Sequence, residues 1–190
     1  MKINNRKDYL LLLLYSEGQT KQKNEPISGR TRLTKMLFLF KQELLGKFRK
    51  GDETKIPFYE FFPWNFGPFS SQVYEDLKFF HLRGFIEETQ DDETETSAES
   101  AAEWGYATEL EDGSDSNFTE YVEQRFSLTN KGCRFAEDLF SELTPTQKNI
   151  LRGFKSKLSS IPLRALLQYV YSEYPEQTEN SIIKEKILGG

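Results

Sequence analysis

Residues 57–87 read P-F-Y-E-F-F-P-W-N-F-G-P-F-S-S-Q-V-Y-E-D-L-K-F-F-H-L-R-G-F-I-E and hold eight of the sixteen phenylalanines of this 190-residue chain. Aromatic side chains bury large apolar areas, so this density predicts that the stretch forms the centre of the hydrophobic core. A chain of this length is expected to form one domain with a sizeable core.

The same stretch is divided by residues that begin and end secondary structure. An aromatic strand ends at Pro63, and a tight turn follows at 67–68. One of the two serines at 70–71 caps a helix that runs to roughly residue 82. Gly84 ends this helix, and a second strand starts at Phe85. Strand, turn, helix and strand in this order indicate the middle of a winged-helix domain.

Apolar periodicity predicts the elements on either side of this unit. Two helices precede it, at 6–16 and 30–45, and Ser28 is expected to cap the second. A strand at 122–128 is expected to pair with 85–88 as a hairpin whose long tip is acidic.

A further helix begins at Thr129, and a capping box with Pro145 at the first helical position opens the C-terminal helices. We therefore predict an α+β fold, mainly α. Residues 1–143 form a winged helix-turn-helix with a long acidic wing. Residues 144–190 form a helical extension that packs on this domain or makes a homodimer interface.

The net charge of −5 hides an asymmetry along the chain. Residues 84–124 contain fourteen Asp and Glu residues and no Lys or Arg, whereas the first fifty residues contain twelve basic and four acidic residues. One acidic stretch therefore creates the low pI, and the rest of the chain is basic. We expect residues 88–117 to be a mobile insertion, because such a composition buries little apolar surface. It could serve as a solvated loop, cover the basic half of the chain, or imitate nucleic acid toward a partner protein.

Several features bear on the compartment. No apolar run reaches the ~20 residues that a transmembrane helix needs, and the single cysteine, Cys133, excludes an internal disulfide. The N-terminus lacks the cleavage pattern of a signal peptide. We expect a cytoplasmic protein that has no membrane partner.

Three strings carry a resemblance to known families. Residues 29–38 (G-R-T-R-L-T-K-M-L-F) are similar to the basic opening helix of the YwgA-like family and of the related Panacea (SocA-like antitoxin) domains. The W-N-F-G-P-F string at 64–69, with Val73-Tyr74 after it, resembles their aromatic Gly-Pro segment. The strings at 84–86 (G-F-I) and at 126–132 (F-S-L-T-N-K-G), the latter with an L-T-x-x-G pattern that many winged-helix regulators share, extend the resemblance to roughly residues 7 to 143. It does not cover the C-terminal helices, and the acidic insertion is longer than expected. For Panacea-type domains it implies neutralisation or targeting of a partner protein; for YwgA-like proteins it implies the fold and little else.

Candidate nucleic-acid contacts lie on two predicted helices. The basic second helix and its flanks would contact phosphates, and the helix at 70–82 would present side chains to bases. The candidates are Arg30, Arg32, Lys35, Lys41, Lys47, Arg49, Lys50, Ser70, Ser71, Gln72 and Lys78. The alternative is that these cations form ordinary solvated faces. The helix at 70–82 is poorly suited to bind DNA by its charge, because Glu75 and Asp76 would face the phosphates.

Aromatic residues are the candidates for a protein interface. They are Trp64, Phe66 and Phe69 of the Gly-Pro segment, and Trp104 and Tyr106 within the acidic insertion. Catalysis has little support, because His81 is the only histidine and no Cys/His set has the spacing of metal ligands. We expect a protein that is not an enzyme and has no cofactor.

Two functions follow from these patterns. The first is a winged-helix protein that binds nucleic acid or regulates a nucleic-acid process. The second is an antitoxin-like or adaptor protein whose main ligand is another protein. The +8 balance of the first fifty residues favours the former, and the charge of the helix at 70–82 favours the latter.

Overall fold

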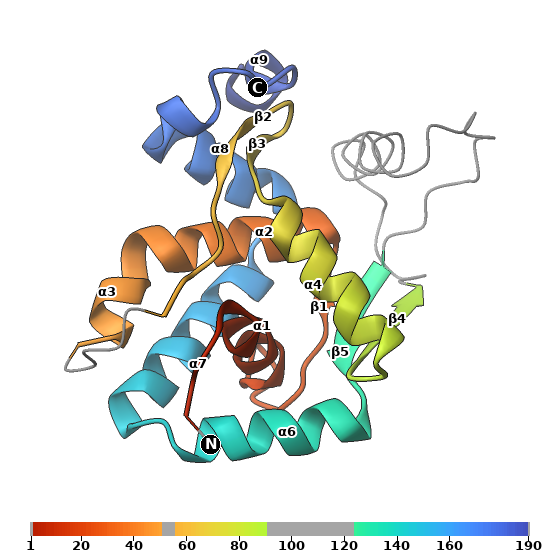
Figure 1. The fold of residues 1–190 in the computed structure, drawn as a ribbon. Helices are drawn as coiled ribbons and strands as arrows, with labels where there is room; N and C mark the ends of the chain where they lie inside the picture. Colours follow the sequence, from red (N-terminus) through yellow and green to blue (C-terminus); the bar gives the residue numbers. More distant parts are fainter. Residues whose placement is uncertain (1, 51–55, 91–123, 190) are drawn as a thin grey trace.

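The computed structural model describes residues 2–50, 56–90 and 124–189, and they form a mainly helical α+β fold (Figure 1). Helix α1 (Arg6–Tyr15) lies in the middle of the molecule, with α6 and α7 packed against it. Its seven side chains from Tyr9 to Tyr15 are all buried. A helix that is apolar on every side is stable only inside the protein, which explains its central place.

The aromatic stretch 57–87 contributes side chains to the core but shares it with α1, so it is not the centre by itself. Of its eight phenylalanines, Phe58, Phe66 and Phe80 are buried, whereas Phe62 and Phe79 are exposed. The prediction about the core centre is therefore wrong in this respect. The density of aromatic residues indicates how apolar the stretch is, but it does not indicate which rings face inward.

The second predicted helix is divided in the structure. Strand β1 (Ile27–Ser28) precedes it, and α2 (Arg30–Leu39), a π-helical turn (Phe40–Leu44) and α3 (Leu45–Phe48) follow one another. Ser28 belongs to the strand, so its assignment as a cap is wrong. Gly29 occupies the N-cap position with φ of 85°, a left-handed conformation that glycine adopts without strain.

The aromatic Gly-Pro segment forms a two-stranded hairpin, β2 (Phe62–Trp64) with β3 (Gly67–Phe69). Helix α4 (Ser71–Leu82) follows, and Gly84, with φ of 67°, ends it. Strands β4 (Ile86–Gln90) and β5 (Gln124–Leu128) then pair antiparallel, with Ile86 opposite Leu128. This confirms the predicted pairing of these two segments. Strand β1 adds to β5, so the sheet order is β1-β5-β4.

The C-terminal helices are part of the same core. They are α6 (Asn130–Ser141), α7 (Pro145–Ser160), α8 (Leu163–Glu173), the 3₁₀ turn η2 (Pro175–Gln177) and α9 (Lys184–Leu188). Thr144 makes the predicted capping box with Gln147. The stripe of α8, namely Leu166, Leu167, Val170 and Tyr171, is buried within the chain, and α8 packs on α2. These four side chains are therefore covered without a second copy.

Candidate functional site

The basic residues of α2 are used inside the protein. Lys35 is fully buried, and its Nζ donates to the carbonyl oxygen of Pro68 at 3.1 Å. Arg32 donates to the carbonyl oxygens of Leu158 and Ile161 at 2.7 and 2.9 Å. The alternative that these cations form an ordinary solvated face is therefore wrong for Lys35, which is buried, whereas Arg32 is half-buried.

The other predicted cations of this region divide into engaged and exposed ones. Lys41 donates to the carbonyl oxygen of Tyr59 at 2.9 Å, and Arg30 forms an ion pair with Glu88 at 3.3 Å. Arg49 donates to the Tyr9 hydroxyl at 2.9 Å and to the carbonyl oxygen of Ile56 at 2.6 Å. Lys47 and Lys50 are exposed. The structure thus does not gather this set into one basic surface.

The predicted residues at the start of α4 are also divided. Ser70 is the buried N-cap, and Gln72 accepts a hydrogen bond from the backbone N–H of Glu60 at 3.0 Å. Ser71 and Lys78 are exposed. The predicted base-reading surface is therefore reduced to these two exposed side chains.

The aromatic candidates lie on the β2–β3 hairpin. Trp64 and Phe69 are half-buried and pack together with a centroid distance of 5.9 Å, next to the exposed Phe62. Phe66 is buried, which is against the prediction that it contacts a partner. Trp104 and Tyr106, with the rest of the acidic insertion from residue 91, lie outside the described residues.

The last two turns of α4 expose large apolar side chains. Leu82 is 74% exposed and Phe79 is 39% exposed. The Nζ of Lys7 lies 3.8 Å from the ring centroid of Phe79, and the guanidinium of Arg83 lies 5.5 Å from it. Sequence reasoning missed this feature, because Phe79 was counted among the core aromatics and nothing in the pattern marked it as exposed.

A hollow of about 530 Å³ lies beside this end of α4, along helix α6. Its lining residues are Phe85, Asn130, Lys131, Arg134, Phe135 and Asp138. The rings of Phe85 and Phe135 meet edge to face with a centroid distance of 5.6 Å, and the Nζ of Lys131 lies 4.4 Å from the Phe85 centroid. The hollow thus has an aromatic floor and a charged border. No pattern in the sequence pointed to it.

The start of α6 is fixed against the end of α4 by the L-T-x-x-G string. The backbone N–H of Thr129 donates to the carbonyl oxygen of Phe85 at 3.0 Å, and its hydroxyl donates to that of Gly84 at 2.7 Å. Lys131 donates to the carbonyl oxygen of Arg83 at 2.8 Å. A Cβ at Gly132 would overlap the Phe85 carbonyl oxygen, so this position needs glycine.

We call the resulting region the α4–α6 surface. It consists of the exposed end of α4 and the border of the hollow. Its residues are Lys78, Phe79, Leu82, Arg83, Phe85, Lys131, Arg134, Phe135 and Asp138.

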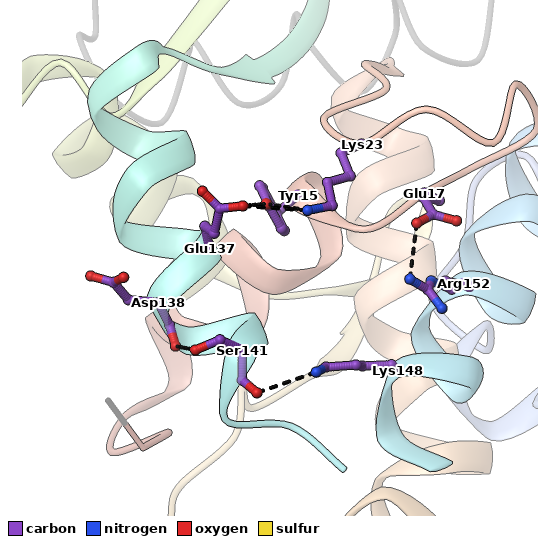
Figure 2. Close-up of polar contacts among 8 residues, drawn as sticks. All are labelled: Tyr15, Glu17, Lys23, Glu137, Asp138, Ser141, Lys148 and Arg152. Atoms are coloured by element: carbon purple, nitrogen blue, oxygen red, sulfur yellow. Dashed lines mark hydrogen bonds and ion pairs between the residues drawn. The ribbon is translucent and has the colours of Figure 1, made fainter. Parts of the chain in front are cut away.

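A neighbouring side of α6 is tied to the body by a polar network (Figure 2). Tyr15 donates to Glu137 at 2.9 Å and accepts from Lys23 at 3.0 Å, while Lys23 pairs with Glu137 at 3.4 Å. Lys148 of α7 donates to the carbonyl oxygen of Ser141 at 3.2 Å. Figure 2 shows the Asp138 carboxylate pointing away from the Tyr15–Glu137 contact. The network therefore fixes one side of α6 while Asp138 borders the hollow.

This network does not prepare a nucleophile. Burial raises the pKa of the Tyr15 hydroxyl, although the hydrogen bond from Lys23 opposes that shift. Hydrogen bonds from Tyr15 and Lys23 lower the pKa of the Glu137 carboxyl. Burial raises the pKa of Cys133, so the thiol form is favoured over the reactive thiolate. The Tyr15 hydroxyl and the Cys133 thiol are therefore both held in their protonated forms.

A second polar cluster lies at the N-terminus of α1. The buried Asp76 accepts from Arg6 Nε at 2.9 Å and from Arg6 Nη2 at 3.3 Å. Burial, with the charge of Asp76 next in size, raises the pKa of Tyr59 well above its ordinary value. Arg6 is itself raised in pKa, mainly by its hydrogen bond to Asp76. This cluster joins α1 to α4 and is accounted for by that structural role.

No protein-family model, curated protein or solved structure matches this chain. None of the helices in the described ranges is long and apolar enough to cross a membrane. Among the same residues, no group of three or more His, Cys, Asp and Glu side chains is placed to hold a metal ion.

Proposed function

We propose that this chain is a winged-helix protein without catalytic activity whose main ligand is another protein. The winged-helix assignment is supported by the order of elements. A helix and a short strand, β1, precede further helices, and β4 and β5 follow α4 as a hairpin. The sheet order β1-β5-β4 and the place of α4 before the hairpin suit this architecture.

The exposed apolar end of α4 carries the proposal of a protein ligand. Leu82 and Phe79 lie where a winged helix would present its recognition helix. Leucine offers no hydrogen bond to a base edge, and the Nζ of Lys7 already lies over the Phe79 ring at 3.8 Å from its centroid. Exposed apolar patches mark protein contact sites, and arginine is enriched in them. The resemblance to Panacea-type domains stays a prediction in the same direction.

Nucleic acid is the second candidate, favoured by one observation. Lys78, Arg83, Lys131 and Arg134 are exposed on the α4–α6 surface, so this surface offers charge to phosphates. The basic α2 helix and the π-helical turn after it offer less charge to phosphates, since Arg32, Lys35 and Lys41 donate to carbonyl oxygens of the protein itself.

Two variants separate these functions. Leu82→Asp places a charge on the α4–α6 surface, and Ile182→Asp does the same at a side chain that is 61% exposed, next to α9. We expect that a protein partner co-purifies from the source cells at high salt with the intact chain and with the Ile182→Asp variant. It should not co-purify with the Leu82→Asp variant. Binding of duplex DNA that falls steeply with salt and needs Lys131 and Arg134, with no such protein partner, would contradict the proposal and support the second candidate.

A further inference from the structure

We propose that the hollow along α6 binds an acidic segment of the partner protein that carries one large apolar side chain. This inference rests on the proposed function, and it adds the chemistry of the ligand. The hollow is the part of the α4–α6 surface where aromatic rings, cations and a concave shape occur together.

The order of the lining residues along α6 gives the hollow a direction. Lys131, Arg134, Phe135 and Asp138 are spaced as i, i+3, i+4 and i+7, so they lie on one face of the helix. Cations therefore stand toward the N-terminal end, an aromatic ring in the middle, and a carboxylate toward the C-terminal end. The macrodipole of α6 adds positive potential at the end where Lys131 stands.

Each part of this face suits a different part of the ligand. An apolar side chain fits against the Phe85 and Phe135 rings, which meet edge to face at 5.6 Å and leave their remaining surface toward the hollow. Carboxylates of neighbouring residues fit near Lys131 and Arg134. A donor, such as a backbone N–H or a lysine, fits near Asp138, where a carboxylate would be repelled.

The site is held in shape by contacts that a ligand does not have to form. Lys131 is directed by its hydrogen bond to the Arg83 carbonyl oxygen and by the Phe85 ring. The capped start of α6 and the Tyr15–Glu137–Lys23 network hold the helix at its N-terminus and on a neighbouring side (Figure 2). Because these groups are ordered beforehand, less conformational entropy is lost on binding.

The experiment uses the full chain and three acetylated pentapeptide amides. The first has phenylalanine between two pairs of acidic residues, the second has glycine in place of the phenylalanine, and the third has the amides Asn and Gln in place of the acids. Amide shifts in ¹H–¹⁵N spectra locate the binding site, and titration gives the affinity. We expect the first peptide to shift the amides of Phe85 and of residues 130–138.

The proposal also predicts how much of the affinity comes from the apolar side chain of the peptide and how much from its acidic residues. Replacing the phenylalanine should weaken binding about tenfold or more, because burial of a large apolar side chain contributes that much. Removing the acids, or making the Arg134→Glu variant, should weaken binding about fivefold. Lys157→Glu, an exposed cation on α7, is the matched control and should leave the affinity unchanged. Thermal unfolding of each variant checks that the fold is retained.

Each remaining outcome overturns the inference in a recognisable way. No binding up to about 5 mM, or shifts confined to the β2–β3 hairpin, would show that the hollow is not the site. If Leu82→Asp still abolishes recovery of the protein partner, the proposed function stands while the assignment of the hollow fails. If a single-stranded oligonucleotide shifts the same amides and the peptides do not, the ligand is nucleic acid and both proposals fail.

Discussion

Lys155 stabilises the end of the central helix, and replacing it by methionine tests how the core is held. Its Nζ is fully buried and donates to the carbonyl oxygens of Leu14, Ser16 and Glu25 at 2.7, 2.9 and 2.6 Å. Two of these oxygens belong to the C-terminal end of α1, which has no basic residue of its own in its last turn. A helix end of this kind leaves carbonyl groups without intrahelical donors.

The expected cost of Lys155→Met follows from these three contacts. A buried polar group left without its partner costs about 1–3 kcal/mol, so three carbonyl oxygens lose several kcal/mol between them. Part of this is offset, because the variant no longer buries an ammonium group. We expect a net loss of about 3 kcal/mol, which for a chain of this size lowers the unfolding temperature by about 6–12 °C.

Urea denaturation followed by circular dichroism measures this loss. Lys157→Met is the matched control, because Lys157 lies two residues away on α7 and is exposed. Its free energy of unfolding should stay within about 0.5 kcal/mol of that of the natural chain. If Lys155→Met proved as stable as the natural chain, the carbonyl groups at the end of α1 would need no cation, and the reasoning would be refuted.

Three further predictions concern the same framework. Burial lowers the pKa of Lys155 from 10.5 to about 7, so between these pH values only the unfolded chain holds the proton. In urea titrations, the stability of the natural chain relative to Lys155→Met should therefore rise from pH 7 to pH 10, by at most about 1.4 kcal/mol per pH unit. A stability difference that does not change with pH would contradict the lowered pKa. Gly132→Ala should lower the unfolding temperature, because the new Cβ would overlap the Phe85 carbonyl oxygen. Gly153→Ala on α7 has open space around it and should be neutral or stabilising by up to about 1 kcal/mol. Equal effects of the two substitutions would argue against the close contact between Gly132 and the Phe85 carbonyl oxygen. Asp76→Asn should cost about 3 kcal/mol in urea denaturation, because Arg6 loses the nearer of its two charged partners and Lys7 loses its ion pair, while the exposed Glu75→Gln should be nearly silent.

Local signals in the sequence predicted much of the framework. The alternation at 122–128 and the stop at Gly84 predicted the β4–β5 pairing, and the pattern at 144–147 predicted the capping box that opens α7. These features depend on neighbours a few residues apart. Strand β1 was missed, because two residues carry no periodicity and are stabilised by pairing with β5 across almost a hundred positions.

The candidate site depended on information that periodicity does not contain. Phe79 and Phe80 are adjacent in the sequence, yet one ring is exposed and the other is buried. The hollow arises from Phe85 and Phe135, which come together only when the turn after α4 packs against the start of α6. The basic character of residues 30–50 was a correct observation about composition, but it did not say which cations point inward.

Basic side chains turn inward in this protein for a common physical reason. Leu158 and Ile161 lie at the C-terminal end of α7, and their carbonyl oxygens accept from Arg32 of α2, just as the end of α1 accepts from Lys155 of α7. Both helix ends are therefore capped by a basic side chain from another helix, whose N–H groups bind carbonyl oxygens that have no intrahelical donor. Basic side chains used in this way stabilise the packing of helices and are not available to an external ligand. The exposed groups therefore carry the argument about a ligand. On the α4–α6 surface these are Lys131 and Arg134 beside the Phe85 and Phe135 rings, with Asp138 at one end, and this pattern is the reason for proposing an acidic segment with an apolar anchor.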